Sequence, residues 1–248
     1  MLDKNAATWY NKTGNGRSVF PFRKNEDTIM EKSAKFYEDV AELQRWAKSF
    51  REFKANEWDT LPDIDLYMDQ VIGYLNRQLK NQGKDKDEGQ ILTPSMINNY
   101  VKSGQVTHPD RKKYVREHLA QLYMLCSMKQ ILTIPDASEL IRRLTDGGHG
   151  IGEVYDAFVS DQHAINEGIA SVIEQTDAVG SEYDLLRVAA GLVLNATAER
   201  LAAERIIALF RASDGDALAV EPPAAPAEKK KTAEKKAQEK KKKADKAE

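Results

Sequence analysis

A short helix with a clear start and a clear end is predicted by Leu92-Thr93-Pro94-Ser95-Met96-Ile97-Asn98-Asn99-Tyr100-Val101-Lys102-Ser103-Gly104. Thr93 is a good N-terminal cap, and Pro94 suits the first helical position. Gly104 is a common left-handed terminator, so we expect the helix to run over Pro94–Ser103. Its apolar residues repeat at helical spacing and are expected to face a core: Met96, Ile97 and Val101.

The outer side of this helix then carries short polar or basic side chains, namely Ser95, Asn98, Asn99 and Lys102. An Asn side chain can pair in a bidentate manner with adenine in the major groove, and Ser can contact phosphates or base edges. A capped helix of this composition suits insertion into a major groove. The pattern therefore favours double-stranded DNA as the partner.

A basic segment follows directly, over Gln105–Tyr114. Pro109-Asp110 is a turn signal, which predicts a short hairpin that grips phosphates. The expected contacts to DNA are basic or aromatic side chains, namely Arg111, Lys112, Lys113, Tyr114 and Arg116. Between Thr93 and His118 there are five basic and two acidic residues, a local charge of +3.

This patch contrasts with the rest of the chain. The 248 residues hold 37 Lys and Arg against 39 Asp and Glu, but the charges are unevenly distributed. Glu228–Glu248 carries ten Lys and five acids, which leaves the first 227 residues with a net charge of −7. An acidic body makes DNA binding by the whole surface unfavourable, so a nucleic-acid site must be local.

Composition also bears on location. We find no basic-then-apolar leader at the N-terminus and no apolar run of the length that spans a membrane. The chain has one cysteine, Cys126, on an apolar helical face, which indicates a small buried hydrophobe in a reducing compartment. The expectation is a cytoplasmic protein that does not contact membranes.

The remaining sequence predicts helices between an N-terminal arm and a C-terminal tail. The expected organisation is a flexible arm (1–25), an amphipathic helix (26–58), a helix-turn-helix domain (59–146), a helical hairpin (151–211) and a disordered Lys/Ala/Glu tail (214–248). Within the domain, the helices are expected at 63–79, 115–131 and 136–144, with a loop at 81–90. The fold class is thus mainly α.

The order of a capped polar helix, a basic hairpin ending in Tyr114, a Leu-rich helix and a last short helix resembles the winged helix-turn-helix of the mercury-resistance-regulator (MerR) superfamily. Three stretches are also similar to a bacterial family, the domain of unknown function numbered eighteen-thirty-six: Leu61–Val71, Leu92–Lys102 and Lys112-Lys113-Tyr114. This second resemblance covers about Trp58–Leu144. The MerR likeness implies a recognition helix and a wing; the other family implies no activity.

In MerR-like proteins a long helix after the DNA domain forms a dimer, so the resemblance implies that the hairpin 151–211 makes a homodimer. The alternative is that the hairpin packs on the N-terminal half of its own chain. Sequence leaves both open.

A different class of function also stays open. The loop at 81–90 is longer than a tight helix-turn-helix turn, and the acidic stretch Asp63–Asp69 faces phosphates poorly. Both features fit a degenerate helix-turn-helix in a protein-interaction adaptor that uses the aromatic N-terminal helix and the C-terminal hairpin. A small-molecule-sensing regulator would need a pocket in the 151–211 hairpin, and no residues in the sequence define one.

Enzymatic signals are weak. Gly147-Gly148-His149-Gly150-Ile151-Gly152 has glycines like a phosphate loop, but no strand precedes it and no Lys-Ser or Lys-Thr follows. His149 and His163 lack metal-ligand spacing. We therefore expect a non-enzymatic protein without cofactor or metal, and we interpret the glycine segment as a flexible connector.

Overall fold

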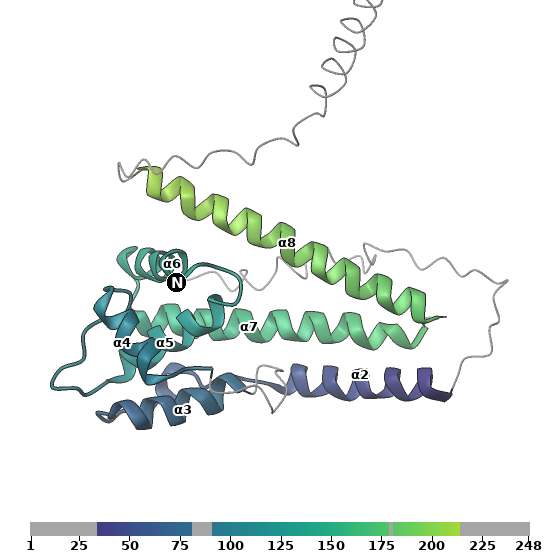
Figure 1. Cartoon of the computed structure of the whole chain (residues 1–248), viewed down its shortest axis with the longest axis horizontal. Coiled ribbons are helices and arrows are strands. Elements are labelled where there is room, and N and C mark those ends of the chain that lie inside the picture. The colour runs from purple at the N-terminus through teal and green to yellow at the C-terminus, as the bar shows by residue number, and fades with distance from the viewer. Residues whose placement is uncertain (1–33, 81–90, 179–180, 214–248) are drawn as a thin grey trace, which may run out of the picture. The chain divides into compact units, whose positions relative to one another are not determined.

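The computed structural model describes residues 34–80, 91–178 and 181–213, and within these segments helices provide nearly all regular structure (Figure 1). In chain order the elements are α2 (Ala34–Glu52), η1 (Trp58–Thr60), α3 (Met68–Lys80), α4 (Pro94–Lys102), α5 (Arg116–Met128), α6 (Ile134–Asp146), α7 (Ile151–Glu174), η2 (Gln175–Ala178) and α8 (Glu182–Ser213). The mainly helical class is confirmed. The expected arm (1–25), loop (81–90) and tail (214–248) lie outside the described residues.

Helix α5 is at the centre of the main core. Its buried residues include Leu119, Leu122 and Leu125, none of which is exposed to solvent. The same cluster takes in buried side chains from α3, α4, α6 and the first half of α7. This core lies in a compact unit that ends at Ile207, and a second unit starts at Ala208. No helix in the described segments has the length and apolar character needed to cross a bilayer.

Helix α4 begins at Pro94, as its sequence predicts, and ends at Lys102, one residue before the predicted end at Ser103. The Thr93 side chain accepts a hydrogen bond from the Met96 amide at 3.3 Å, and Pro94 occupies the first turn. Gly104 has φ of 71°, and the next amide, that of Gln105, donates to the Tyr100 carbonyl at 2.8 Å. The helix is thus closed at both ends by local signals.

A buried asparagine joins α3 to the start of α4. Asn76 on α3 donates its side-chain amide to the Leu92 carbonyl at 2.9 Å and accepts the Leu92 amide at 3.0 Å. Because Asn76 is 8% exposed and Leu92 is fully buried, both bonds are shielded from water. This pair fixes the position of α4 independently of the length of the chain between the two helices.

The helix expected at 63–79 begins later than predicted, at Met68. The preceding residues are diverted because Leu66 pairs with Tyr114 in an antiparallel bridge. The Leu66 amide donates to the Tyr114 carbonyl, and the Tyr114 amide donates to the Leu66 carbonyl, both at 2.8 Å. A pairing between residues so far apart in sequence gives no local signal, so the sequence placed the start of this helix five residues too early.

Helix α2 ends at Glu52, short of the predicted residue 58, and packs on α7. Ala47 is buried against Ala170 and Ile173 of α7. Arg51 donates both terminal nitrogens to the Glu174 carboxylate at 2.7 Å. Figure 1 shows α2 and α7 side by side. The first helix of the expected hairpin therefore packs on its own chain.

Other helix bounds differ slightly from those expected. Helix α5 stops at Met128 and does not continue to residue 131. Helix α6 starts two residues early, at Ile134, because the Thr133 hydroxyl caps it by accepting the Asp136 amide. Helix α8 continues to Ser213, beyond the expected end at residue 211.

The glycine segment before α7 includes one close packing contact. A Cβ atom added at Gly152 would lie 2.8 Å from Cε2 of the Trp58 indole. Arg116 lies near the same ring, with its guanidinium carbon 5.4 Å from the centroid. Gly152 is therefore required for packing against Trp58. The interpretation of this segment as a flexible connector does not account for that contact.

Gly152→Ala should lower the free energy of unfolding by about 1–3 kcal/mol, because the added methyl group would overlap the indole of Trp58. The matched control is Gly150→Ala, where an added Cβ meets no atom within 4 Å. Urea unfolding followed by circular dichroism measures both. Equal stability of the two variants would contradict the contact.

Candidate nucleic-acid interface

The outer row of α4 is exposed, as the sequence predicts. Ser95, Asn98, Asn99 and Lys102 all point to solvent, while Ile97 and Tyr100 on the opposite side are buried. Their four side chains make no hydrogen bond or ion pair with any residue that the structure describes. Two amides, a hydroxyl and an ammonium group are thus presented together on one short helix.

The hairpin expected over Gln105–Tyr114 contains no strand and is reduced to a tight turn at Asp110–Lys113, closed by one antiparallel bridge in which the Lys113 amide donates to the Asp110 carbonyl at 2.8 Å. Its two central residues have positive φ, 46° for Arg111 and 66° for Lys112. Consecutive left-handed residues are typical of a type I′ turn, which normally prefers Asn and Gly. Residues other than glycine lower the stability of the fold in this conformation. The turn therefore places two long basic side chains at the surface at a cost in stability.

A hollow of about 450 Å³ joins the helix to the hairpin. Asn98 and Lys102 line it from α4, and Lys112 lines it from the turn. Its lining also includes Tyr67, Met68 and His108, which the sequence analysis did not single out, together with Asp69, Val101, Pro109 and Tyr114. Two residues of the outer row of α4, Asn98 and Lys102, therefore border the same hollow as Lys112 of the turn, whereas Ser95, Asn99 and Arg111 do not line it.

Two of the expected phosphate contacts pair with acidic side chains of the same chain. Lys113 pairs with Asp65 at 3.2 Å. Arg116 pairs with Asp63 at 3.3 Å and is 18% exposed. Of the five basic residues in the predicted set, three remain available at the surface: Lys102, Arg111 and Lys112. Arg111 is 88% exposed and lies 4.0 Å from Asp110, a weak contact.

Tyr114, also expected to contact DNA, is 2% exposed. Burial raises the pKa of its phenol. Its ring stands edge-on to His118, with centroids 5.5 Å apart. His118 accepts the Val115 amide at 3.0 Å through Nδ1, and burial lowers its pKa. Tyr114 therefore supports the base of the hairpin and is not on its surface.

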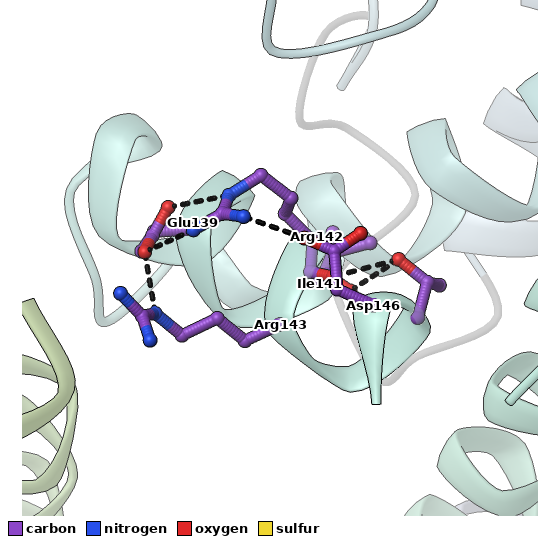
Figure 2. A network of polar contacts seen from close by, with 6 residues as sticks. Glu139, Ile141, Arg142, Arg143 and Asp146 are labelled. Carbon is purple, nitrogen blue, oxygen red and sulfur yellow. Dashed lines mark hydrogen bonds and ion pairs between the residues drawn. The ribbon is translucent and has the colours of Figure 1, made fainter. Parts of the chain in front are cut away.

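The arginines of α6 do not extend the basic surface. Figure 2 shows Glu139 between Arg142 and Arg143. Arg142 also pairs with Asp146. Hydrogen bonds from Arg142 and Arg143 lower the pKa of Glu139 to about 2, so the carboxylate stays charged at neutral pH. These side chains neutralise one another along the helix.

Other candidate chemistry is limited in the described part of the chain. Cys126 is buried, and burial raises the pKa of its thiol to about 11, so it is a core residue and not a nucleophile. The described residues contain no group of three or more His, Cys, Asp or Glu side chains placed to hold a metal ion. His149 instead lies 3.1 Å from Glu153 on the surface.

Residues 56–158 match the model of a family described as a domain of unknown function, DUF1836. The resemblance to that family is confirmed over this segment, which takes in the hollow and nearly all of the main core. Helices α2 and α8 lie outside it. Neither the curated proteins nor the solved structures include a match to this chain.

Replacing the turn by its preferred residues, Arg111→Asn with Lys112→Gly, should raise the free energy of unfolding by about 1 kcal/mol. Left-handed backbone costs roughly 1–2 kcal/mol at each non-glycine residue, and the flexibility of the unfolded glycine returns part of the gain. Arg111→Gln with Lys112→Gln is the control, because it removes the charge and keeps the strain. Chemical denaturation should give the control a stability within about 0.5 kcal/mol of the native chain; a gain of equal size in both variants contradicts strain as its source.

Proposed function

We propose that the protein is a sequence-specific DNA-binding transcription regulator that acts in the cytoplasm. The main observation behind this proposal is that Asn98 and Lys102 of α4 and Lys112 of the turn border one hollow, and that four polar side chains on the outer side of α4 are unengaged. In this proposal residues 59–146 form a MerR-like winged helix-turn-helix. Helix α4 is the recognition helix, and the hairpin is the wing.

The roles of the side chains follow from their chemistry. Asn98 and Asn99 address base edges, where an amide can donate and accept at the same time. Ser95 and Lys102 assist from the two ends of the helix. Arg111 and Lys112 bind phosphates from the tip of the wing, where both side chains are exposed.

The remaining members of the predicted set act indirectly. Lys113 ties the wing to Asp65, Tyr114 ties it to Leu66, and Arg116 ties α5 to the acidic segment before α3. These contacts fix the position of the wing relative to α4. A wing anchored in this way contacts the backbone without the loss of freedom that a mobile loop would incur.

We also propose that the regulator is a homodimer formed through α8. Five large apolar side chains lie along one side of this helix, at steps of three or seven residues apart from the adjacent pair Val193 and Leu194, and each is between 55% and 69% exposed: Tyr183, Leu186, Val193, Leu194 and Leu201. The opposite side contacts the body through Val188 and Leu192. A helix that is apolar on two sides is expected to be buried on both, and a second copy of the chain provides a symmetric cover.

The rival function is a protein-interaction adaptor. It is favoured by one observation on α2, where Tyr37 is 57% exposed and Trp46 is 38% exposed. Trp46 stacks on Phe50 at 4.9 Å between ring centroids. Protein partners that remain bound after nuclease treatment would favour the adaptor over the regulator. Their binding should be lost in Trp46→Ala and kept when Arg111 and Lys112 are replaced.

Arg111→Gln with Lys112→Gln should weaken binding to every duplex and reduce the salt slope by about 1.8, since each lost phosphate contact removes about 0.9. Lys113→Gln is the matched control, because Lys113 is already paired with Asp65, and it should change the slope by less than half as much. Fluorescence anisotropy at several salt concentrations measures the slope. Absence of salt-dependent duplex binding by the native chain would reject the proposal.

Base reading is tested separately, through recovery of bound DNA on a genomic scale. The native protein should return a reproducible two-fold motif. Asn98→Ala should relax the preference at one position of each half-site by about tenfold, while Asn195→Ala on α8 should leave the motif unchanged. A motif that survives Asn98→Ala intact would remove α4 from the recognition role.

Leu186→Glu with Leu194→Glu should convert the protein from a dimer to a monomer, because two charges would be buried at a symmetric apolar contact. Sedimentation should give the native chain about twice its 27.9 kDa and the variant its single mass. Ala202→Glu, exposed on another side of α8, should remain a dimer. A monomeric native chain at tens of micromolar would contradict the dimer.

A further inference from the structure

A second cavity, separate from the hollow beside α4, lies between the end of α5, the middle of α7 and the inner side of α8. Its volume is about 430 Å³, which is in the range of small-molecule sites. Most of its wall is apolar, with Met128, Ile131, Leu132, Phe158 and Ile165 contributing large side chains. None of these residues belongs to the proposed DNA interface.

Small side chains of α8 border the cavity. Ala196 and Ala203 line it opposite the apolar residues of α5 and α7. Because α8 has few contacts with these two helices, the space between them stays open. A leucine or phenylalanine at either alanine position would occupy part of the volume, so the size of the site can be changed at single positions.

The charged groups around the cavity have one predominant sign. Asp161 on α7 and Glu199 on α8 both line it as solvent-exposed residues, and neither has a hydrogen-bonding or charged partner within the described ranges. The one basic residue in the lining, Arg200, is engaged by Glu204 at 2.5 Å. Partial burial raises the pKa of Asp161.

We propose that this cavity binds a small organic cation with an apolar body, the body against Phe158 and Met128 and the charge between Asp161 and Glu199. An organic anion would meet two uncompensated carboxylates, and a purely apolar ligand would leave them unused. Such binding requires neither DNA nor a second copy of the chain, so it stands or fails separately from the regulator and the dimer.

The full chain can be tested with (2-naphthylmethyl)trimethylammonium, using 2-naphthalenesulfonate as an anion of similar size and shape. Isothermal titration calorimetry should show saturable binding of the cation at one site per chain. The anion should bind at least about tenfold more weakly, because like charge disfavours it. Absence of saturable cation binding, or equal affinity for the two probes, would overturn the proposal.

Two kinds of variant locate the site. Ala203→Phe fills the cavity and should weaken cation binding by at least about tenfold, whereas Ala202→Phe, one residue away and exposed, should leave it unchanged. Asp161→Asn with Glu199→Gln changes the side-chain volume little and should weaken cation binding roughly fivefold. It should also reduce the difference in affinity between the cation and the anion. Cation binding that is unaffected by the carboxylate pair would overturn the proposal even if Ala203→Phe failed to fold.

Discussion

The arrangement of the candidate interface depends on the pair of hydrogen bonds between the Asn76 amide and the Leu92 backbone. Helix α4 has nine residues, too few to be stable in isolation, so its position must come from contacts outside it. Asn76 supplies one donor and one acceptor to a buried backbone residue, as a neighbouring strand would. Loss of either bond would leave a polar group buried and unpaired, a cost of about 1–3 kcal/mol.

The same logic explains how an acidic body carries a basic surface. The segment before α3 contributes Asp59, Asp63 and Asp65 near the hairpin, and two of the basic residues, Lys113 and Arg116, are bound by them. Arg116 in addition lies over the Trp58 ring, which packs on Gly152. The acids thus anchor the base of the hairpin through charge, while its tip keeps Arg111 and Lys112 exposed.

The parts that sequence could predict are those encoded locally. Thr93, Pro94 and Gly104 define α4 within a dozen residues, and the spacing of Ile97 separates its buried side from Asn98 and Asn99. The parts that sequence missed depend on distant pairing. Nothing near Tyr114 in the chain reveals that its backbone pairs with Leu66, so its burial was not foreseen. Likewise, the sequence alone predicts a uniform patch of charge +3 at the basic cluster. The fold places Asp63 and Asp65 beside it, where they pair with Arg116 and Lys113.

Helix α8 shows why apolar periodicity alone did not distinguish a dimer from an intramolecular contact. Leu186, Val193 and Leu201 are exposed on one side, while Val188 and Leu192 are turned toward the body on another, so both readings of the pattern have residues to support them. The alanines that make close helix contact possible also leave the inner side of α8 incompletely filled at Ala196 and Ala203. Few large side chains on α8 are buried within one chain. The stability of this helix therefore depends on what covers its exposed apolar side and on what fills the space at Ala196 and Ala203.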